Sequence, residues 1–190
     1  MDRFLATVSD VLPIWNTTRA AGLTSYVLLF VSMVAGMLQS FSWMTPSGRK
    51  TLNILHQSSG WFGLLFGMVH GFVLFFAQEK GLSLKEIFVP FAAHTRSLQI
   101  GLGIIALYMV ILVMVTSDWM KQFGRKVWRS IHYLSFPAYL FALAHGVLLG
   151  PDTQYREIVI MYVVTAGIVV ILFVLRMTQG TSRKHASFAK

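Results

Sequence analysis

The chain has 190 residues, of which 55% are hydrophobic, 12% are charged and none is cysteine. Its mean hydropathy of +0.64 is typical of an integral membrane protein. This composition excludes a separate soluble domain of ordinary size, and the lack of cysteine excludes disulfides, iron–sulfur clusters and thiolate metal ligands. In so apolar a chain we interpret the net charge of +9 as a signal of membrane topology, and we expect no nucleic-acid partner.

Five apolar segments, separated by turn-rich breaks, follow one another along the chain. They cover residues 22–41, 52–77, 98–117, 127–149 and 158–175. Each meets or approaches the ~20 residues that a helix needs to cross a bilayer. The sequence therefore predicts an all-α integral membrane protein built as a bundle of five transmembrane helices. We expect residues 1–20 to form a short N-terminal surface segment, residues 21–176 a membrane domain and residues 177–190 a polar tail.

The distribution of basic residues predicts the orientation of this bundle. One side of the membrane would carry Arg3, Arg19, Lys80, Lys85, Arg96 and Arg156. The other side would carry Arg49, Lys50, Lys121, Arg125, Lys126, Arg129, Arg176, Arg183, Lys184 and Lys190. Since the more basic side faces the cytoplasm, we expect the N-terminus outside, the C-terminal tail inside, and a multi-pass protein of the plasma membrane.

Four histidines lie in the second and fourth apolar segments as two matched pairs. His56 and His70 are 14 residues apart, and His132 and His145 are 13 residues apart. At 1.5 Å per residue these separations are about 21 Å and about 20 Å. The two segments are expected to run parallel, because one span lies between them. This matches His56 with His132 at the cytoplasmic end and His70 with His145 at the outer end.

Histidines at membrane depth are energetically costly and usually functional. Two neutral imidazoles on opposite faces suit the iron of a six-coordinate b-type haem, which transfers electrons. We therefore predict two b haems, an inner one held by His56 and His132 and an outer one held by His70 and His145. Hydrogen bonding of the histidines across helices is the less favoured alternative. Zinc is also less favoured, because pairs about 20 Å apart cannot converge on one ion.

Helix geometry adds a condition to this prediction. Fourteen residues advance about 1400°, which leaves His56 and His70 on one face of a helix. Thirteen residues advance about 1300°, so a regular helix would not aim His132 and His145 at the same partner. Pro137 lies between them and is expected to introduce a kink or local rewinding that corrects the aim.

Two further sets of residues have open interpretations. Gly60, Gly63, Gly67 and Gly71 form one helical stripe, which indicates either close helix packing or clearance for a flat cofactor. Basic side chains flank the histidine pairs, and most are expected to be topology determinants. We single out Arg49 and Arg129 for the inner haem propionates and Arg96 for the outer ones.

Three stretches of the sequence resemble the ferric reductase-like transmembrane domain family. They are TRAAGLTSYVLL (residues 18–29), LHQSSGWFGL (residues 55–64) and WRSIHYLSF (residues 128–136). That family includes the membrane halves of ferric reductases and NADPH oxidases, and the haem subunit of a bacterial periplasmic methionine sulfoxide reductase system. The resemblance, which extends over about residues 18 to 175, implies ligation of two b haems by the four histidines and electron flow outward from the cytoplasm.

Reductases of this family often continue into a cytoplasmic flavin- and NAD(P)H-binding module. The present sequence has no glycine-rich dinucleotide fingerprint, so we expect no flavin or NAD(P)H site in this chain. It resembles the shorter, stand-alone bacterial members, which take electrons from a separate flavoprotein or from quinol.

The sequence thus predicts an oxidoreductase component that needs a separate electron donor. It would pass electrons through the bilayer from a cytoplasmic or membrane donor to an outer acceptor, such as ferric iron, oxygen or a partner redox protein. One alternative is a quinol-oxidising cytochrome b subunit that anchors a larger respiratory enzyme. Another is a redox-inactive polytopic protein, although the apolar segments lack the carboxylates of many ion-coupled carriers.

Overall fold

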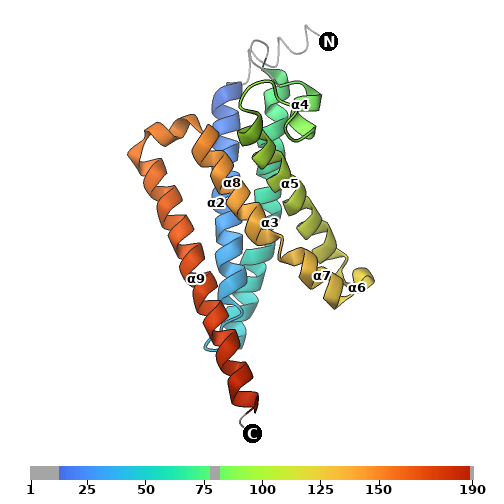
Figure 1. The fold of residues 1–190 in the computed structure, drawn as a ribbon, viewed down its shortest axis with the longest axis vertical. Coiled ribbons are helices and arrows are strands. Elements are labelled where there is room, and N and C mark those ends of the chain that lie inside the picture. Colours follow the sequence, from blue (N-terminus) through green and yellow to red (C-terminus); the bar gives the residue numbers. More distant parts are fainter. Residues whose placement is uncertain (1–12, 78–81, 189–190) are drawn as a thin grey trace.

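The computed structural model describes residues 13–77 and 82–188, with side chains up to residue 178. Within these residues, all regular structure is helical, and five helices are long and apolar enough to cross a membrane (Figure 1). The predicted all-α architecture with five spans is confirmed. Most of the expected N-terminal surface segment, residues 1–12, lies outside the described residues.

The helices follow the predicted order, with short helices in the connections. They are α2 (Ile14–Leu38), α3 (Pro46–Val73), η1 (Leu74–Phe76), α4 (Leu84–Phe88), α5 (Ser97–Asp118), α6 (Met120–Phe123), α7 (Arg125–His132), α8 (Ser135–Leu149), η2 (Pro151–Gln154) and α9 (Arg156–Phe188). The fourth predicted span is therefore two helices, α7 and α8, rather than one.

Two helices extend beyond their apolar segments. The first begins at Ile14, because Pro13 occupies its N-cap and the Pro13 carbonyl accepts a hydrogen bond from the Thr17 N–H at 2.9 Å. Part of the expected surface segment thus belongs to the first span. At the other end, α9 continues through the expected polar tail as far as Phe188, since extending an existing helix costs far less than starting one.

The stripe of glycines on α3 packs against α2, which runs antiparallel beside it. A Cβ atom at Gly60 would lie 3.3 Å from Ser32 Oγ, and one at Gly63 would lie 3.1 Å from Leu29 Cδ2. The Ser25 hydroxyl also donates to the Gly63 carbonyl at 2.7 Å. The stripe therefore serves close helix packing, although Gly71 has open space beside it.

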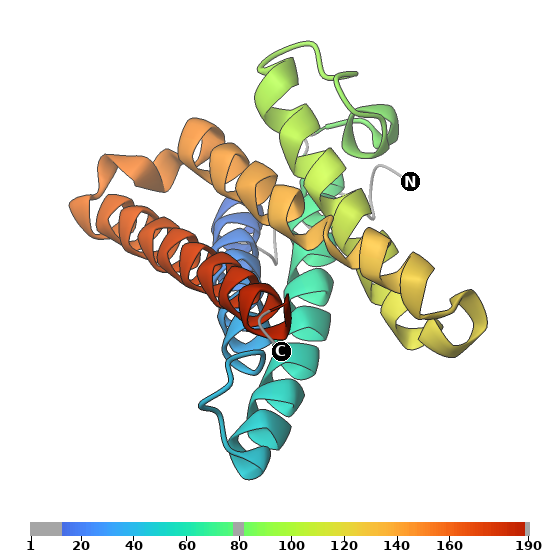
Figure 2. The same ribbon diagram turned by 60° about the horizontal axis from the view of Figure 1, so that its bottom comes forward.

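Helix α9 lies at the edge of the bundle and is held there by a buried tyrosine cluster (Figure 2). The Tyr26 hydroxyl of α2 forms hydrogen bonds with Tyr139 Oη of α8 at 2.9 Å and with Thr165 Oγ1 of α9 at 2.6 Å. The Tyr162 ring packs edge-on against Tyr26, with ring centres 4.9 Å apart. These polar groups satisfy one another at mid-span, as buried polar groups must in lipid.

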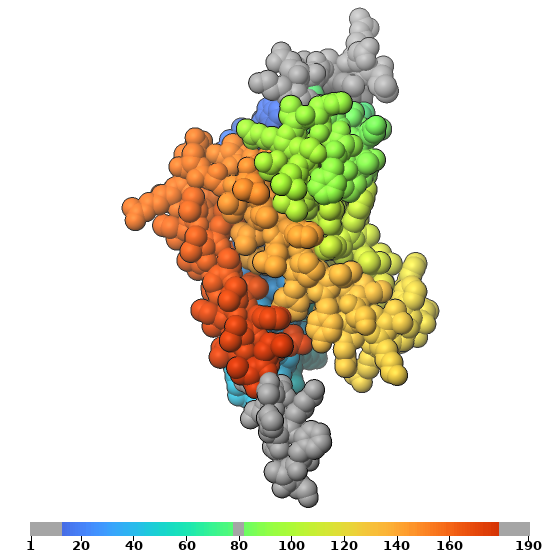
Figure 3. Space-filling model, viewed as in Figure 1, coloured from blue at the N-terminus to red at the C-terminus, as the bar shows by residue number. Residues whose placement is uncertain are grey.

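The outward surface of α9 is apolar over several turns (Figure 3). Large hydrophobic side chains are exposed there, including Val163, Val170, Ile171 and Val174. In a protein surrounded by water such a face would need a partner, whereas in a bilayer it meets lipid tails.

Candidate functional site

The outer histidine pair joins α3 to α8. The His70 and His145 rings have their centres 5.8 Å apart and are nearly perpendicular, at 86°. His70 Nδ1 lies 2.9 Å from the Thr18 carbonyl oxygen, and His145 Nδ1 lies 2.8 Å from the Gln99 carbonyl oxygen. Since a carbonyl only accepts, each Nδ1 donates its hydrogen, and each Nε2 keeps a lone pair for a metal ion.

The inner pair joins α3 to the last residue of α7. The His56 and His132 ring centres are 5.9 Å apart at 74°. His56 Nδ1 donates to the Ser32 carbonyl at 2.9 Å. In contrast, His132 Nδ1 is buried and has no hydrogen-bond partner among the described residues. The two predicted pairs therefore come together at two levels of the bundle, but one of the four rings is held differently.

Glycines make room for the three anchored rings. A Cβ atom at Gly22 would lie 2.7 Å from His70 Nδ1, one at Gly36 3.0 Å from His56 Nδ1, and one at Gly103 2.6 Å from His145 Nδ1. Such distances leave no room for a side chain at Gly22 or Gly103. These three residues are positioning residues that the sequence reasoning missed.

Each of these glycines lies four residues after the residue whose carbonyl accepts the histidine hydrogen bond. The carbonyl and glycine pairs are Thr18 with Gly22, Ser32 with Gly36, and Gln99 with Gly103. Four residues is one helical turn, so the carbonyl points along the helix toward the bare glycine. A signal was present in the sequence, because Gly22 and Gly36 repeat the 14-residue spacing of His56 and His70.

The break between α7 and α8 explains how both of their histidines face α3 (Figure 1). Pro137 has no N–H to donate, and its ring disfavours a regular turn around the carbonyl of Tyr133. The Leu134 N–H bonds instead to the Ile131 carbonyl at 2.9 Å, a tighter i→i−3 turn. The predicted irregularity is confirmed, and it lies one turn before Pro137.

The three singled-out arginines have different surroundings. Arg49 donates to the Phe41 carbonyl at 2.9 Å and to the Met44 carbonyl at 3.1 Å, so it closes the loop between α2 and α3. Arg129 and Arg96 are exposed, and neither side chain forms a hydrogen bond or ion pair with another described residue. No printed contact brings any of the three to a histidine ring, and their role toward propionates stays a prediction.

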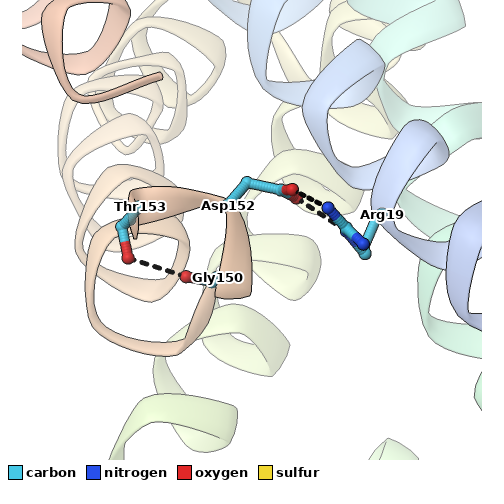
Figure 4. A network of polar contacts seen from close by, with 4 residues as sticks. All are labelled: Arg19, Gly150, Asp152 and Thr153. Atoms are coloured by element: carbon cyan, nitrogen blue, oxygen red, sulfur yellow. Dashed lines mark hydrogen bonds and ion pairs between the residues drawn. The ribbon is translucent and has the colours of Figure 1, made fainter. Parts of the chain in front are cut away.

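An ion pair at the outer end escaped the sequence reasoning, which counted its members only as loop charges (Figure 4). Arg19 Nε donates to Asp152 Oδ2 at 3.0 Å, and a second guanidinium nitrogen donates to Oδ1. Asp152 is buried in the turn η2, and the Thr153 hydroxyl bonds to the Gly150 carbonyl within the same turn. The pair fastens the α8–α9 connection next to Thr18, the acceptor for His70.

The donor set fits a cofactor that brings its own equatorial ligands. No group of three or more His, Cys, Asp or Glu in the described part of the chain could hold a bare metal ion. A bond from a metal to an imidazole nitrogen is about 2.0 Å long, so two rings on opposite sides of one ion would have centres about 6 Å apart. The separations of 5.8 and 5.9 Å suit haem iron.

These features define a class, a multi-pass helical membrane protein with two stacked pairs of facing histidines. A family model described as "Ferric reductase like transmembrane component" matches residues 21–143. The chain belongs to this family, and the resemblance noted from the sequence is confirmed. The matched region includes His56, His70 and His132 and ends shortly before His145. Neither the comparison with curated proteins nor that with solved structures found a match.

Proposed function

We propose that the protein is a transmembrane di-haem b-type cytochrome that passes electrons from a cytoplasmic or membrane donor to an outer acceptor. The observation that carries this proposal is the stacking of two His–His pairs at two depths, with ring centres 5.8 and 5.9 Å apart. Membership of the ferric reductase-like family supports a membrane redox role.

In this proposal, His56 and His132 hold the inner haem iron, and His70 and His145 hold the outer one, all through Nε2. The bound haems would supply one-electron chemistry, as haem with two axial histidines does in cytochromes. The bonds from Nδ1 of His56, His70 and His145 to backbone carbonyls fix the tautomer and the ring orientation.

The orientation in the membrane is also part of the proposal. The bias of Lys and Arg places the inner pair at the cytoplasmic face of a plasma membrane and fits a bacterial stand-alone member. Residues 21–176 would form the haem domain. Arg129 and Arg96 are exposed candidates for the inner and outer propionates, whereas the guanidinium of Arg49 is already engaged by two carbonyls.

The donor is proposed to be a separate flavoprotein or quinol, and the acceptor an outer oxidant or redox protein. We expect no flavin or NAD(P)H site among these residues, because the polar groups of the membrane domain are used in the histidine sites and in helix packing. No feature of the described residues favours the alternative of a quinol-oxidising anchor subunit.

The test is a reduced-minus-oxidised optical spectrum of the purified protein, with haem quantified per chain. We expect two low-spin b haems per chain. A protein that was expressed with ample haem and contains none would overturn the proposal.

A further inference from the structure

One of the four histidines lacks the arrangement that holds the other three. His56, His70 and His145 each donate from Nδ1 to a helix carbonyl beside a glycine. His132 Nδ1 is buried without an acceptor. The difference concerns the second nitrogen of the ring, which stays free of the metal in every site.

The missing acceptor can be located on α5. This helix runs antiparallel to α7 and α8 and supplies Gln99 and Gly103 to the site of His145. Moving 13 residues along α5, the separation of His132 and His145, gives Leu112 and Thr116. The register is supported by the hydrogen bond from Trp128 Nε1 to Ser117 Oγ at 3.2 Å, which joins α7 to α5 one turn before His132.

Thr116 closes this position to a histidine in two ways. It has a Cβ atom where the other three sites have glycine, and the side chain is buried. Its hydroxyl also donates to the Leu112 carbonyl at 2.7 Å, which engages the acceptor that His132 would need. The fourth site therefore has the same plan as the others, but threonine occupies its anchor.

The backbone around His132 adds freedom of movement. His132 is the last residue of the short helix α7, and the irregular turn at Tyr133 and Leu134 follows directly. Its ring packs beside Trp128, with ring centres 5.1 Å apart at 35°, and this contact has little directional preference. His145, by contrast, lies within the continuous helix α8 and is anchored by a hydrogen bond.

We propose that His132 is an exchangeable ligand, so that the inner site binds a small neutral diatomic molecule on ferrous iron while the outer site does not. This inference rests on the proposed function. A hydrogen bond from Nδ1 raises the basicity of a coordinating imidazole and fixes its direction, and His132 has neither benefit. In the exchange, the bond from iron to His132 Nε2 breaks and a bond from iron to the carbon of CO forms. The iron stays ferrous, and the imidazole leaves neutral.

The experiment titrates the purified, dithionite-reduced protein with CO and follows the optical spectrum. We expect one CO for every two haems in the wild-type protein. The His70→Ala variant should lose the outer haem, and its remaining haem should bind CO with wild-type affinity. Thr116→Gly frees the Leu112 carbonyl and removes the Cβ, so it should lower CO affinity on the order of tenfold.

Thr116→Val is the matched control, because it removes the hydroxyl but keeps the Cβ that blocks the ring. It should bind CO like the wild-type protein. A protein without haem would contradict the proposed function itself. Two haems that bind no CO, or that both bind it with equal affinity, would overturn only the inference, and this holds even if Thr116→Gly fails to fold.

Discussion

The outer and inner histidine pairs have almost the same separation but different support. Ring centres are 5.8 Å apart in the outer pair and 5.9 Å apart in the inner pair. Both outer rings donate to backbone carbonyls, whereas only His56 does so in the inner pair. Similar distances between ligands therefore do not mean similar ligand strength, because the hydrogen bonds behind the rings decide how firmly they are held.

The difference follows from the two helix pairs that build the sites. In α2 and α3, carbonyl, glycine and histidine all repeat at 14 residues, so one regular packing arrangement makes two equal anchors. On the other side, the break in α7–α8 changes the histidine spacing to 13 residues, and this shift along α5 meets Thr116 rather than glycine. The irregularity aims His132 at His56, while the anchor is lost.

The largest effects are expected from removing the ligands themselves. His70→Ala or His145→Ala should abolish the outer haem, and His56→Ala or His132→Ala the inner one, because a single axial imidazole holds b haem weakly. Haem per chain and the optical spectrum measure this. His94→Ala is the matched control, since His94 is exposed in a loop. Equal loss of both haems from every variant would contradict the assignment of pairs by depth.

The next largest effects are expected at the glycines. Gly22→Ala and Gly103→Ala place a Cβ 2.7 Å and 2.6 Å from a histidine Nδ1, so each should reduce outer haem retention on the order of tenfold. The control is Gly167→Ala on α9, where a Cβ meets no atom within 4 Å. Haem retained after dilution in detergent provides the measurement. Unchanged retention in both variants would show that the ring positions tolerate displacement.

A smaller effect is expected from the ion pair at the outer end. Asp152→Asn removes the charge that Arg19 faces, and a half-exposed pair of this kind should stabilise the fold by about 1 kcal/mol. Because Arg19 follows Thr18, the outer haem should be released at a lower temperature while the inner haem is little affected. Thermal release monitored at both haem bands tests this, with the exposed Glu157→Gln as control. Equal effects on both haems would separate the ion pair from the outer site.

The smallest effect concerns pH at the short helix α4. The Ser83 hydroxyl and N–H donate to Glu86, and these bonds hold the pKa of the Glu86 carboxyl below its ordinary 4.5. A lowered pKa stabilises the helix end above the ordinary value, and this contribution is lost as the pH falls through the lowered pKa. Amide exchange in residues 84–88 should therefore increase in acid, while α7 at the other end changes less. Ser83→Ala should reduce this pH dependence, and an unchanged profile would contradict it.

The sequence by itself determined the five spans and the depth of the histidines. Hydropathy acts locally, and the helical rise is constant, so segments of about 20 apolar residues and spacings of 14 and 13 residues translate directly into position across a bilayer. Pro137 also carried its own information, because a missing N–H disturbs a helix wherever it lies. Helix ends were less accurate: α2 begins at Ile14 and α9 continues to Phe188, beyond the apolar residues.

Only the tertiary structure decided how each ring is held. The acceptors for His56, His70 and His145 are backbone carbonyls of neighbouring helices, and carbonyls carry no signature in the sequence. The orphaned Nδ1 of His132 and the pairing of Arg19 with Asp152 depend likewise on the rotation and register of packed helices. Spacing along one helix fixes depth but not the facing surface of another, and that surface sets the hydrogen bonds behind the four histidines.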